Sequence, residues 1–146
     1  MNQLLFEQLD PIKIPLIQRF YKQHYPSGKA KKDEQVIIAK DNQHQICAAV
    51  RFRHISNYQL LTGMTVATEK RQQGIGHQLL TFCEQRILHE QVYCFALAHL
   101  KDFYTTHHFR YQEPDTLPEA IRTLYFRYTR QGKVLIPMRY ITPGPR

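Results

Sequence analysis

The 146-residue sequence lacks a long hydrophobic run and has few cysteines. No segment approaches the ~20 apolar residues of a membrane-spanning helix, so we expect no membrane span. The N-terminus has no basic flank, sustained apolar core or small-residue cleavage site, which predicts a cytoplasmic protein without a signal peptide. The three cysteines, Cys47, Cys83 and Cys94, have no C-x-x-C spacing, and each lies in an apolar stretch. We interpret them as buried free thiols in a reducing compartment.

The sequence also lacks internal repeats, low-complexity tracts and any linker between two halves. This length suits one domain, which we expect over residues 1–141, with residues 142–146 as a loose tail. The net charge of +8 favours polyanionic partners without choosing among nucleic acid, an anionic membrane and a phosphate-bearing cofactor. Because no nucleic-acid recognition motif accompanies the charge, we expect neither a nucleic-acid nor a membrane partner.

Hydrophobic periodicity predicts alternating strands and helices. Strand-like runs occupy residues 3–9, 35–40, 45–54, 58–66, 91–98, 109–112 and 134–141. We expect helices after Asp10-Pro11, from residue 75, over residues 100–107 and after residue 116. Asp10 is placed to cap the first helix, and Thr116-x-x-Glu119 matches a capping box for the last one. The polar residues 41–44 predict a hairpin.

The order of these elements predicts an α+β fold. Three successive strands joined by short turns, from residue 35 to residue 66, indicate an antiparallel meander. The strand 58–66, the glycine-rich loop, the helix and the strand 91–98 then form a βαβ-like crossover. We therefore expect a mixed, mostly antiparallel sheet of about six to seven strands, with helices on both faces and the crossover at its centre.

The glycine-rich loop after residue 66 has the chemistry of an anion site. Gly74 and Gly76 allow close backbone approach, and the following helix directs its free N–H groups at the loop. Such a loop suits a pyrophosphate, and Arg71 and Lys70 add positive charge. It is neither G-x-G-x-x-G, because Leu79 occupies the last position, nor a P-loop. A tight helix-entry turn without a ligand is the alternative.

The loop and two flanking segments resemble the GNAT superfamily of N-acetyltransferases. The family's acetyl-CoA loop, Q/R-x-x-G-x-G/A, matches Arg71-Gln-Gln-Gly74-Ile-Gly76. The family strand before the loop matches Leu60-Leu-Thr-Gly-Met-Thr-Val66 in place and character. The family's FYxxxGF element resembles Phe103-Tyr104-Thr-Thr-His-His108-Phe109. The predicted order of strands and helices is similar to the family over nearly the whole chain.

This resemblance implies an N-acetyltransferase that uses acetyl-CoA as co-substrate and no metal. An amine would attack the thioester directly in a ternary complex, and Tyr104 would donate a proton to the departing CoA thiolate. The implied cofactor-binding residues are those of the strand end and the loop: Met64, Thr65, Val66, Arg71, Gln72, Gln73, Gly74, Ile75, Gly76 and His77. The backbone of Met64 and Val66 would pair with the pantetheine arm, and residues 72–77 would cradle the pyrophosphate. Tyr104 as one more core aromatic is the alternative.

The sequence departs from the family at two positions. Some members carry a glutamate base on the strand before the loop, where this chain has Leu60. His54, or a water relayed through backbone carbonyls, remains as the base, and a non-catalytic acetyl-CoA sensor remains as the alternative function. His108 replaces the family glycine, and histidine tolerates positive φ better than most residues. The neighbouring histidines 99, 107 and 108 match no standard metal-ligand spacing.

The acceptor amine would enter, by the same resemblance, over residues 20–31 and 114–133. Both segments are rich in tyrosine, arginine and lysine: Tyr21, Tyr25, Arg122, Tyr125, Arg127 and Tyr128. A basic, aromatic rim favours a small-molecule or peptide amine that carries a carboxylate or phosphate. The alternative, that the aromatics at helical spacing pack in the core, stays open.

Overall fold

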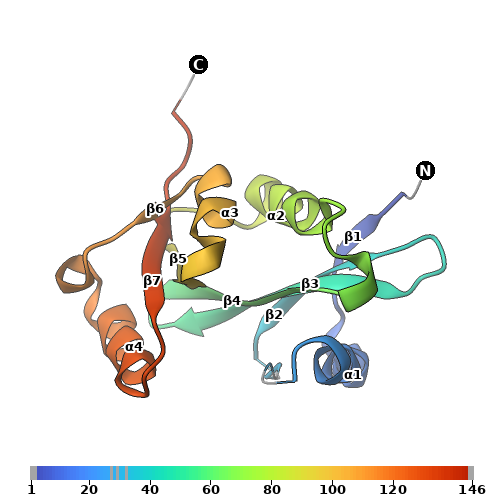
Figure 1. Ribbon diagram of the computed structural model, residues 1–146, viewed down its shortest axis with the longest axis horizontal. Helices are drawn as coiled ribbons and strands as arrows, with labels where there is room; N and C mark the ends of the chain where they lie inside the picture. The colour runs from blue at the N-terminus through green and yellow to red at the C-terminus, as the bar shows by residue number, and fades with distance from the viewer. Residues whose placement is uncertain (1–2, 27, 29, 32, 145–146) are drawn as a thin grey trace. The chain divides into compact units, whose positions relative to one another are not determined.

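The computed structural model of the chain describes residues 3–26, 28, 30–31 and 33–144. Within them, seven strands follow the hydrogen-bonding order β1-β2-β3-β4-β5-β7-β6 (Figure 1). The strands are β1 (Leu5–Gln8), β2 (Gln35–Lys40), β3 (Ile46–Ile55), β4 (Tyr58–Val66), β5 (Val92–Leu97), β6 (Phe109–Tyr111) and β7 (Leu135–Tyr140). The α-helices are α1 (Ile14–His24), α2 (Ile75–Arg86), α3 (Lys101–Thr106) and α4 (Glu119–Arg130). The predicted α+β class with a mixed sheet is confirmed.

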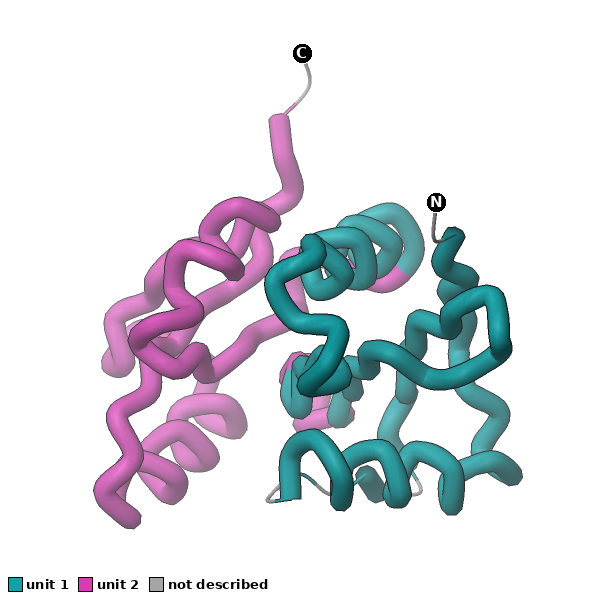
Figure 2. Tube along the Cα trace, turned by 45° about the vertical axis from the view of Figure 1, so that its right-hand side comes forward, with its two compact units in different colours: residues 1–53, 62–86 teal, residues 54–61, 87–146 magenta. Residues whose placement is uncertain are grey.

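The chain divides into two compact units (Figure 2). Unit 1 comprises residues 1–53 and 62–86, and unit 2 comprises residues 54–61 and 87–146. Strand β4 contributes its first half to unit 2 and its second half to unit 1. Unit 1 therefore contains the glycine-rich loop, and unit 2 contains Tyr104.

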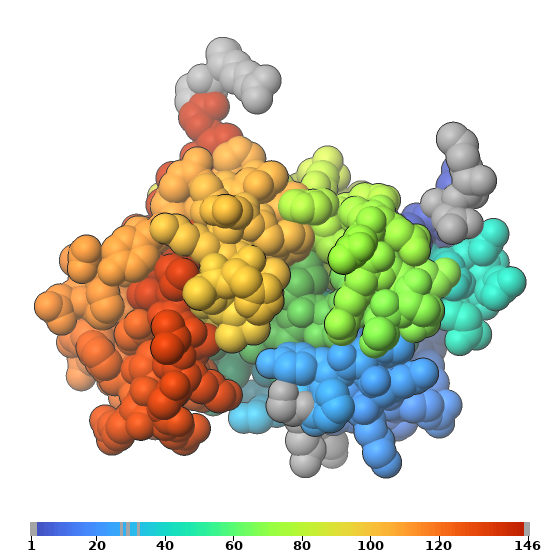
Figure 3. All heavy atoms as spheres, in the orientation of Figure 1, coloured from blue at the N-terminus to red at the C-terminus, as the bar shows by residue number. Residues whose placement is uncertain are grey.

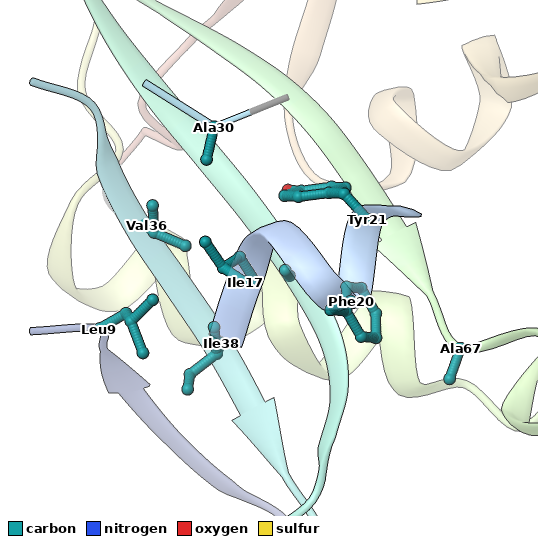
Figure 4. Close-up of a cluster of buried hydrophobic side chains, with 9 residues drawn as sticks. Leu9, Ile17, Phe20, Tyr21, Ala30, Val36, Ile38 and Ala67 are labelled. Atoms are coloured by element: carbon teal, nitrogen blue, oxygen red, sulfur yellow. The ribbon is translucent and has the colours of Figure 1, made fainter. Parts of the chain in front are cut away.

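Unit 1 is built on the antiparallel strands β1, β2 and β3. Strand β2 is buried on both faces, because the successive residues Val36, Ile37, Ile38 and Ala39 are all inaccessible. Val36 and Ile38 join the cluster that α1 covers with Ile17, Phe20 and Tyr21 (Figure 4). Helix α2 contacts β2 from the opposite face (Figure 1). Each fully buried large side chain contributes about 1.5–3 kcal/mol to this packing.

Two local signals in unit 1 act as predicted. The Asp10 carboxylate accepts a hydrogen bond from the Ile12 N–H at 3.1 Å and caps the turn η1 (Pro11–Lys13) that leads into α1. The Asp41 carboxylate closes the β2–β3 hairpin by accepting from the N–H groups of Gln43 at 2.9 Å and Gln45 at 3.0 Å. Both carboxylates thus satisfy backbone donors that a turn leaves unpaired.

Unit 2 completes the mixed sheet. Strand β5 pairs in parallel with the first half of β4, from Gln59↔Val92 to Leu61↔Cys94, and antiparallel with β7. Strand β6 pairs antiparallel with β7. Helix α4 buries Ile121 and Leu124 against Leu60 and Tyr93. The parallel β4–β5 pair with α2 between them in sequence is the predicted crossover.

The predicted capping box at Thr116 is wrong. Thr116 belongs to the turn η4 (Pro114–Thr116), and its hydroxyl donates to the Glu113 carbonyl at 2.7 Å. Helix α4 begins two residues later than that box requires, with Pro118 as its N-cap and no side-chain cap. The reason is Pro118 itself, since the residue before a proline is driven out of the helical region, and Leu117 is extended, with ψ 144°.

The predicted thiols are confirmed as free and buried. Burial raises the pKa of Cys83 to about 12, and it also raises the pKa of Cys94. Because the thiolate is the nucleophilic form, these two groups are inert at neutral pH. No helix within the described ranges is long and apolar enough to cross a membrane.

Candidate functional site

The loop between β4 and α2 turns through two left-handed residues. Gln72 has φ 66° and Gly74 has φ 80°. The Gly74 carbonyl accepts from the Gln78 N–H at 3.0 Å and so begins α2. Residues 71–74 are exposed, and a side chain added to Gly74 would meet no atom within 4 Å. Figure 3 shows the green segment that contains α2 at the surface of unit 1. The helix entrance is therefore open to a ligand.

The backbone amides of this loop are available. Among the residues that the structure describes, the N–H groups of residues 72–76 donate no hydrogen bond to another backbone group. Successive amides around left-handed residues form a concave anion-binding arrangement, and the partial positive charge at the α2 N-terminus adds to it. The N–H groups of residues 72–76 are thus unpaired with other backbone groups at an exposed turn.

Arg71 has a second task besides its charge. Its Nε donates to the Val66 carbonyl at 3.0 Å, and its Nη2 donates to the His24 carbonyl at 3.3 Å. The His24 ring nitrogen Nδ1 in turn accepts from the Thr68 N–H at 3.1 Å. These bonds tie the start of the loop to the end of β4 and to the end of α1. Arg71 therefore fixes the position of the loop.

Lys70, the other cation expected at the loop, is engaged by Asp41. Lys70 Nζ lies 3.6 Å from Asp41 Oδ2. The backbone hydrogen bonds from Gln45 and Gln43, together with the Lys70 charge, hold the pKa of the Asp41 carboxyl below its usual value. The hairpin aspartate thus remains ionised at neutral pH and orders the turn η2 (Thr68–Lys70) before the loop.

Among the described residues, the second half of β4 pairs with a strand of unit 1 along one edge only. The pairing with β5 ends at Leu61, and the Ala67 N–H continues the opposite edge by donating to the Cys47 carbonyl at 2.8 Å. Gly63 interrupts this half of the strand with φ 66°. Met64 and Val66 are half-buried, while Thr65 is buried and donates to the Gly63 carbonyl at 3.2 Å.

A buried polar cluster surrounds Gly63, and sequence reasoning missed it. It consists of Tyr21, Glu34, Arg51 and Gly63, and we call it the Arg51 cluster. The Tyr21 hydroxyl donates to the Gly63 carbonyl at 2.8 Å. The Arg51 guanidinium lies 4.9 Å from the centre of the Tyr21 ring and its Nε lies 3.7 Å from Glu34 Oε1. Burial raises the pKa of Tyr21.

In unit 2, Tyr104 lies buried on α3 and its ring packs edge-to-face on Phe103 and Phe109, at 5.1 and 5.7 Å. His108, at the position where the FYxxxGF pattern has glycine, adopts φ 71°. The His108 carbonyl accepts from the Ile141 N–H at 2.9 Å, which holds that turn against the chain after β7. His108 thus adopts a left-handed conformation, which glycine takes most easily.

The aromatic side chains of the two segments predicted to form the acceptor rim differ in their burial. Tyr21 is in the core, and Tyr25 is 40% exposed. Tyr125 is half-buried, packs edge-to-face on Phe95 and donates its hydroxyl to the Leu135 carbonyl at 2.9 Å. The open alternative, core packing, holds for Tyr21 and in part for Tyr125. Residues 27 and 29 of the first segment lie outside the described residues.

The proposed base and the histidine group also have defined places. His54 is exposed near the end of β3. Within residues 3–26, 28, 30–31 and 33–144, no three His, Cys, Asp or Glu side chains come together as a metal-binding group. His107 is buried and His99 is exposed.

Solved structures share this fold at low sequence identity. N-acetylglutamate synthase from Neisseria gonorrhoeae, complexed with coenzyme A and N-acetyl-glutamate, matches with TM-score 0.70 and 13% identity, over 97% of this chain and 36% of that one. An acetyltransferase of the GNAT family from Staphylococcus aureus Mu50 matches with TM-score 0.62 and 14% identity, over 97% and 100%. An aminoglycoside 6'-N-acetyltransferase complexed with coenzyme A matches with TM-score 0.65 and 13% identity, over 97% and 99%.

This chain therefore spans about a third of the Neisseria enzyme and the whole of the other two. No curated protein sequence matches it. The family model for the acetyltransferase (GNAT) domain matches residues 8–130, which cover parts of both units. That match covers the meander, the glycine-rich loop and Tyr104 together. The chain belongs to the GNAT acetyltransferase family.

Proposed function

We propose that the protein is an N-acetyltransferase that moves the acetyl group of acetyl-CoA to a primary amine within a ternary complex. The observation that carries this proposal is the exposed glycine-rich turn with its free N–H groups at residues 72–76. A pyrophosphate accepts hydrogen bonds from such a turn and interacts favourably with the α2 N-terminus. We take both units as parts of one transferase domain, over residues 1–141.

The cofactor would lie along unit 1. The pyrophosphate would rest on residues 72–77, and the pantetheine arm would run along the open edge of Met64, Thr65 and Val66. The Val66 carbonyl already accepts from Arg71 Nε, so its second lone pair would serve the added segment. Arg71 then acts mainly by holding strand end and loop in register, with its charge as a secondary contribution.

The chemistry requires two proton transfers. The neutral amine nitrogen attacks the thioester carbon, the carbon–sulfur bond breaks, and the thiolate leaves. Tyr104 would donate its proton to that thiolate. A backbone N–H of β4 would stabilise the oxyanion of the intermediate. His54 or a relayed water would accept the proton that the attacking nitrogen loses.

The acceptor is an amine from a small molecule or a peptide, and we propose that it carries an anionic group. The Neisseria N-acetylglutamate synthase was crystallised with an amino-acid product, N-acetyl-glutamate. Its likeness to this chain supports the fold alone, so the support for an anionic acceptor comes from the basic charge of this chain, +8. Electrostatic attraction of that size raises encounter rates with anions.

A steady-state assay tests the proposal. CoA thiol release is measured with acetyl-CoA and a panel of primary amines, and CoA affinity is measured separately by calorimetry. The proposal expects CoA binding together with amine-dependent thiol release. CoA binding without turnover for any amine would instead favour the sensor, for which the buried Leu60 in place of a strand carboxylate is the supporting observation. Absence of CoA binding would exclude both.

A further inference from the structure

The Arg51 cluster contains hydrogen-bond donors that the protein itself leaves unused. Arg51 is only 6% exposed, and its Nε and Nη1 atoms are buried with no hydrogen-bond partner among the described residues. Glu34 lies 3.7 Å from Nε, which makes an ion pair but is too long for a hydrogen bond. Buried polar groups in proteins are nearly always hydrogen-bonded, because leaving one unpaired costs the full desolvation penalty.

The Arg51 guanidinium lies close to the segment of β4 where we place the thioester. A side chain on Gly63 would come within 2.8 Å of Arg51 Nε and 3.0 Å of Nη2. The missing side chain of Gly63 therefore leaves room for the guanidinium directly beside the β4 backbone. The next residue, Met64, opens the segment along which we place the pantetheine arm. The unused donors are thus held next to the part of the strand where transfer would occur.

The other groups of the cluster hold Arg51 in place. Glu34 accepts from the Lys31 N–H at 2.7 Å and lies 3.7 Å from the guanidinium. The Tyr21 ring lies at 4.9 Å, where it attracts the cation, and its hydroxyl is fixed on the Gly63 carbonyl. The guanidinium therefore has few alternative orientations, which is what a specificity-determining group requires.

We propose that Arg51 binds a carboxylate of the acceptor, so that the protein acetylates carboxylate-bearing amines. A planar guanidinium pairs with a planar carboxylate through charge-assisted hydrogen bonds. A monoanion fits better than a dianionic phosphate, because Glu34 already balances the Arg51 charge and would repel a second negative charge more strongly. This inference rests on the proposed transferase activity.

The test compares matched acceptors. Thiol release is measured with amino acids and their carboxamides, and with phosphoethanolamine against ethanolamine, for the wild type and for Arg51→Gln. Arg19→Gln, on the exposed surface of α1, is the control. We expect the wild type to prefer the carboxylates about 10- to 100-fold in kcat/KM, the effect of a charge-assisted pair. Arg51→Gln should remove this preference, and Arg19→Gln should keep it.

Each of the following results would overturn the inference. Equal kcat/KM of the wild type for amino acids and their carboxamides would contradict the inference but not the transferase activity. This comparison does not depend on the folding of a variant. If Arg51→Gln keeps the preference for carboxylates, or loses stability and nothing else, the cluster has only a structural role. If the preference for phosphoethanolamine over ethanolamine exceeds the preference for acids over amides, the group that Arg51 recognises is a phosphate and not a carboxylate. Turnover with no amine at all would remove the proposed function and this inference with it.

Discussion

Gly63 and Gly74 lie in the same unit, both in left-handed conformations, with φ 66° and 80°. Their surroundings differ completely. A side chain on Gly74 would meet nothing within 4 Å, whereas one on Gly63 would meet Arg51 and Tyr21 at 2.8–3.0 Å. Gly74 is thus required for the shape of an exposed turn, and Gly63 for shape and for space in a buried cluster. At the proposed cofactor site, backbone groups would bind the ligand. In the Arg51 cluster, side chains make the interactions.

The largest expected effect is on the rate of the chemical step, at Tyr104. This residue lies outside both glycine sites. Tyr104→Phe keeps the ring that packs on Phe103 and Phe109 but removes the proposed acid. We expect kcat to fall by about 10²- to 10⁴-fold, the contribution of a positioned acid. CoA affinity, measured by calorimetry, should remain nearly unchanged. An unchanged kcat would leave Tyr104 as a core aromatic.

Gly63→Ala should break the buried member of the pair. The left-handed φ costs an alanine about 1–2 kcal/mol, and the added methyl displaces Arg51 or Tyr21 in a packed region, for a sum of about 3 kcal/mol. Denaturant unfolding of the purified variant measures this loss. Stability equal to that of the wild type would show that the cluster relaxes freely and does not hold Arg51.

Gly74→Ala should affect the exposed member through the backbone alone. The strain of about 1–2 kcal/mol is relieved when the turn changes shape, so the proposed cradle is lost and CoA should bind about tenfold more weakly. Gly74→Asn is the matched control, since asparagine tolerates the left-handed region, and it should retain most of the affinity. Equal affinities for the three proteins would separate this turn from CoA binding.

The smallest expected effect concerns Asp41, which orders the turn before the loop. Its folded-state pKa is lowered, first by the Gln45 N–H. The carboxylate therefore contributes stability above its unfolded pKa of ~3.9, and this stability is lost as the pH falls through the lower folded pKa. The free energy of unfolding is measured between about pH 6 and pH 3. It should fall more steeply for the wild type than for Asp41→Asn. Parallel curves would contradict this role.

Local patterns in the sequence predicted much of the fold. Strand β2 was expected at residues 35–40 and is found there, because a buried run ends in the turn that Asp41 closes. The start of α2 follows from Gly74, since few other residues adopt its φ. The capping box at Thr116 failed because Pro118 moved the helix start, a local signal given too little weight.

The Arg51 cluster could not be predicted in the same way. Tyr21, Glu34 and Arg51 come from α1, the segment before β2, and β3, and no spacing in the sequence brings them together. An arginine in a strand is ordinarily expected to face solvent. One available signal was Gly63, because a glycine inside a strand often marks a bulge or a close approach by another group.

The central claim is that the free amides of residues 72–76 bind the pyrophosphate of CoA. Backbone amide NMR during a titration with CoA tests it most directly, with pantetheine, which lacks the pyrophosphate, as the control ligand. We expect large downfield shifts of the amide protons of residues 72–76 with CoA and small ones with pantetheine. Binding of CoA that leaves these amides unshifted would contradict it.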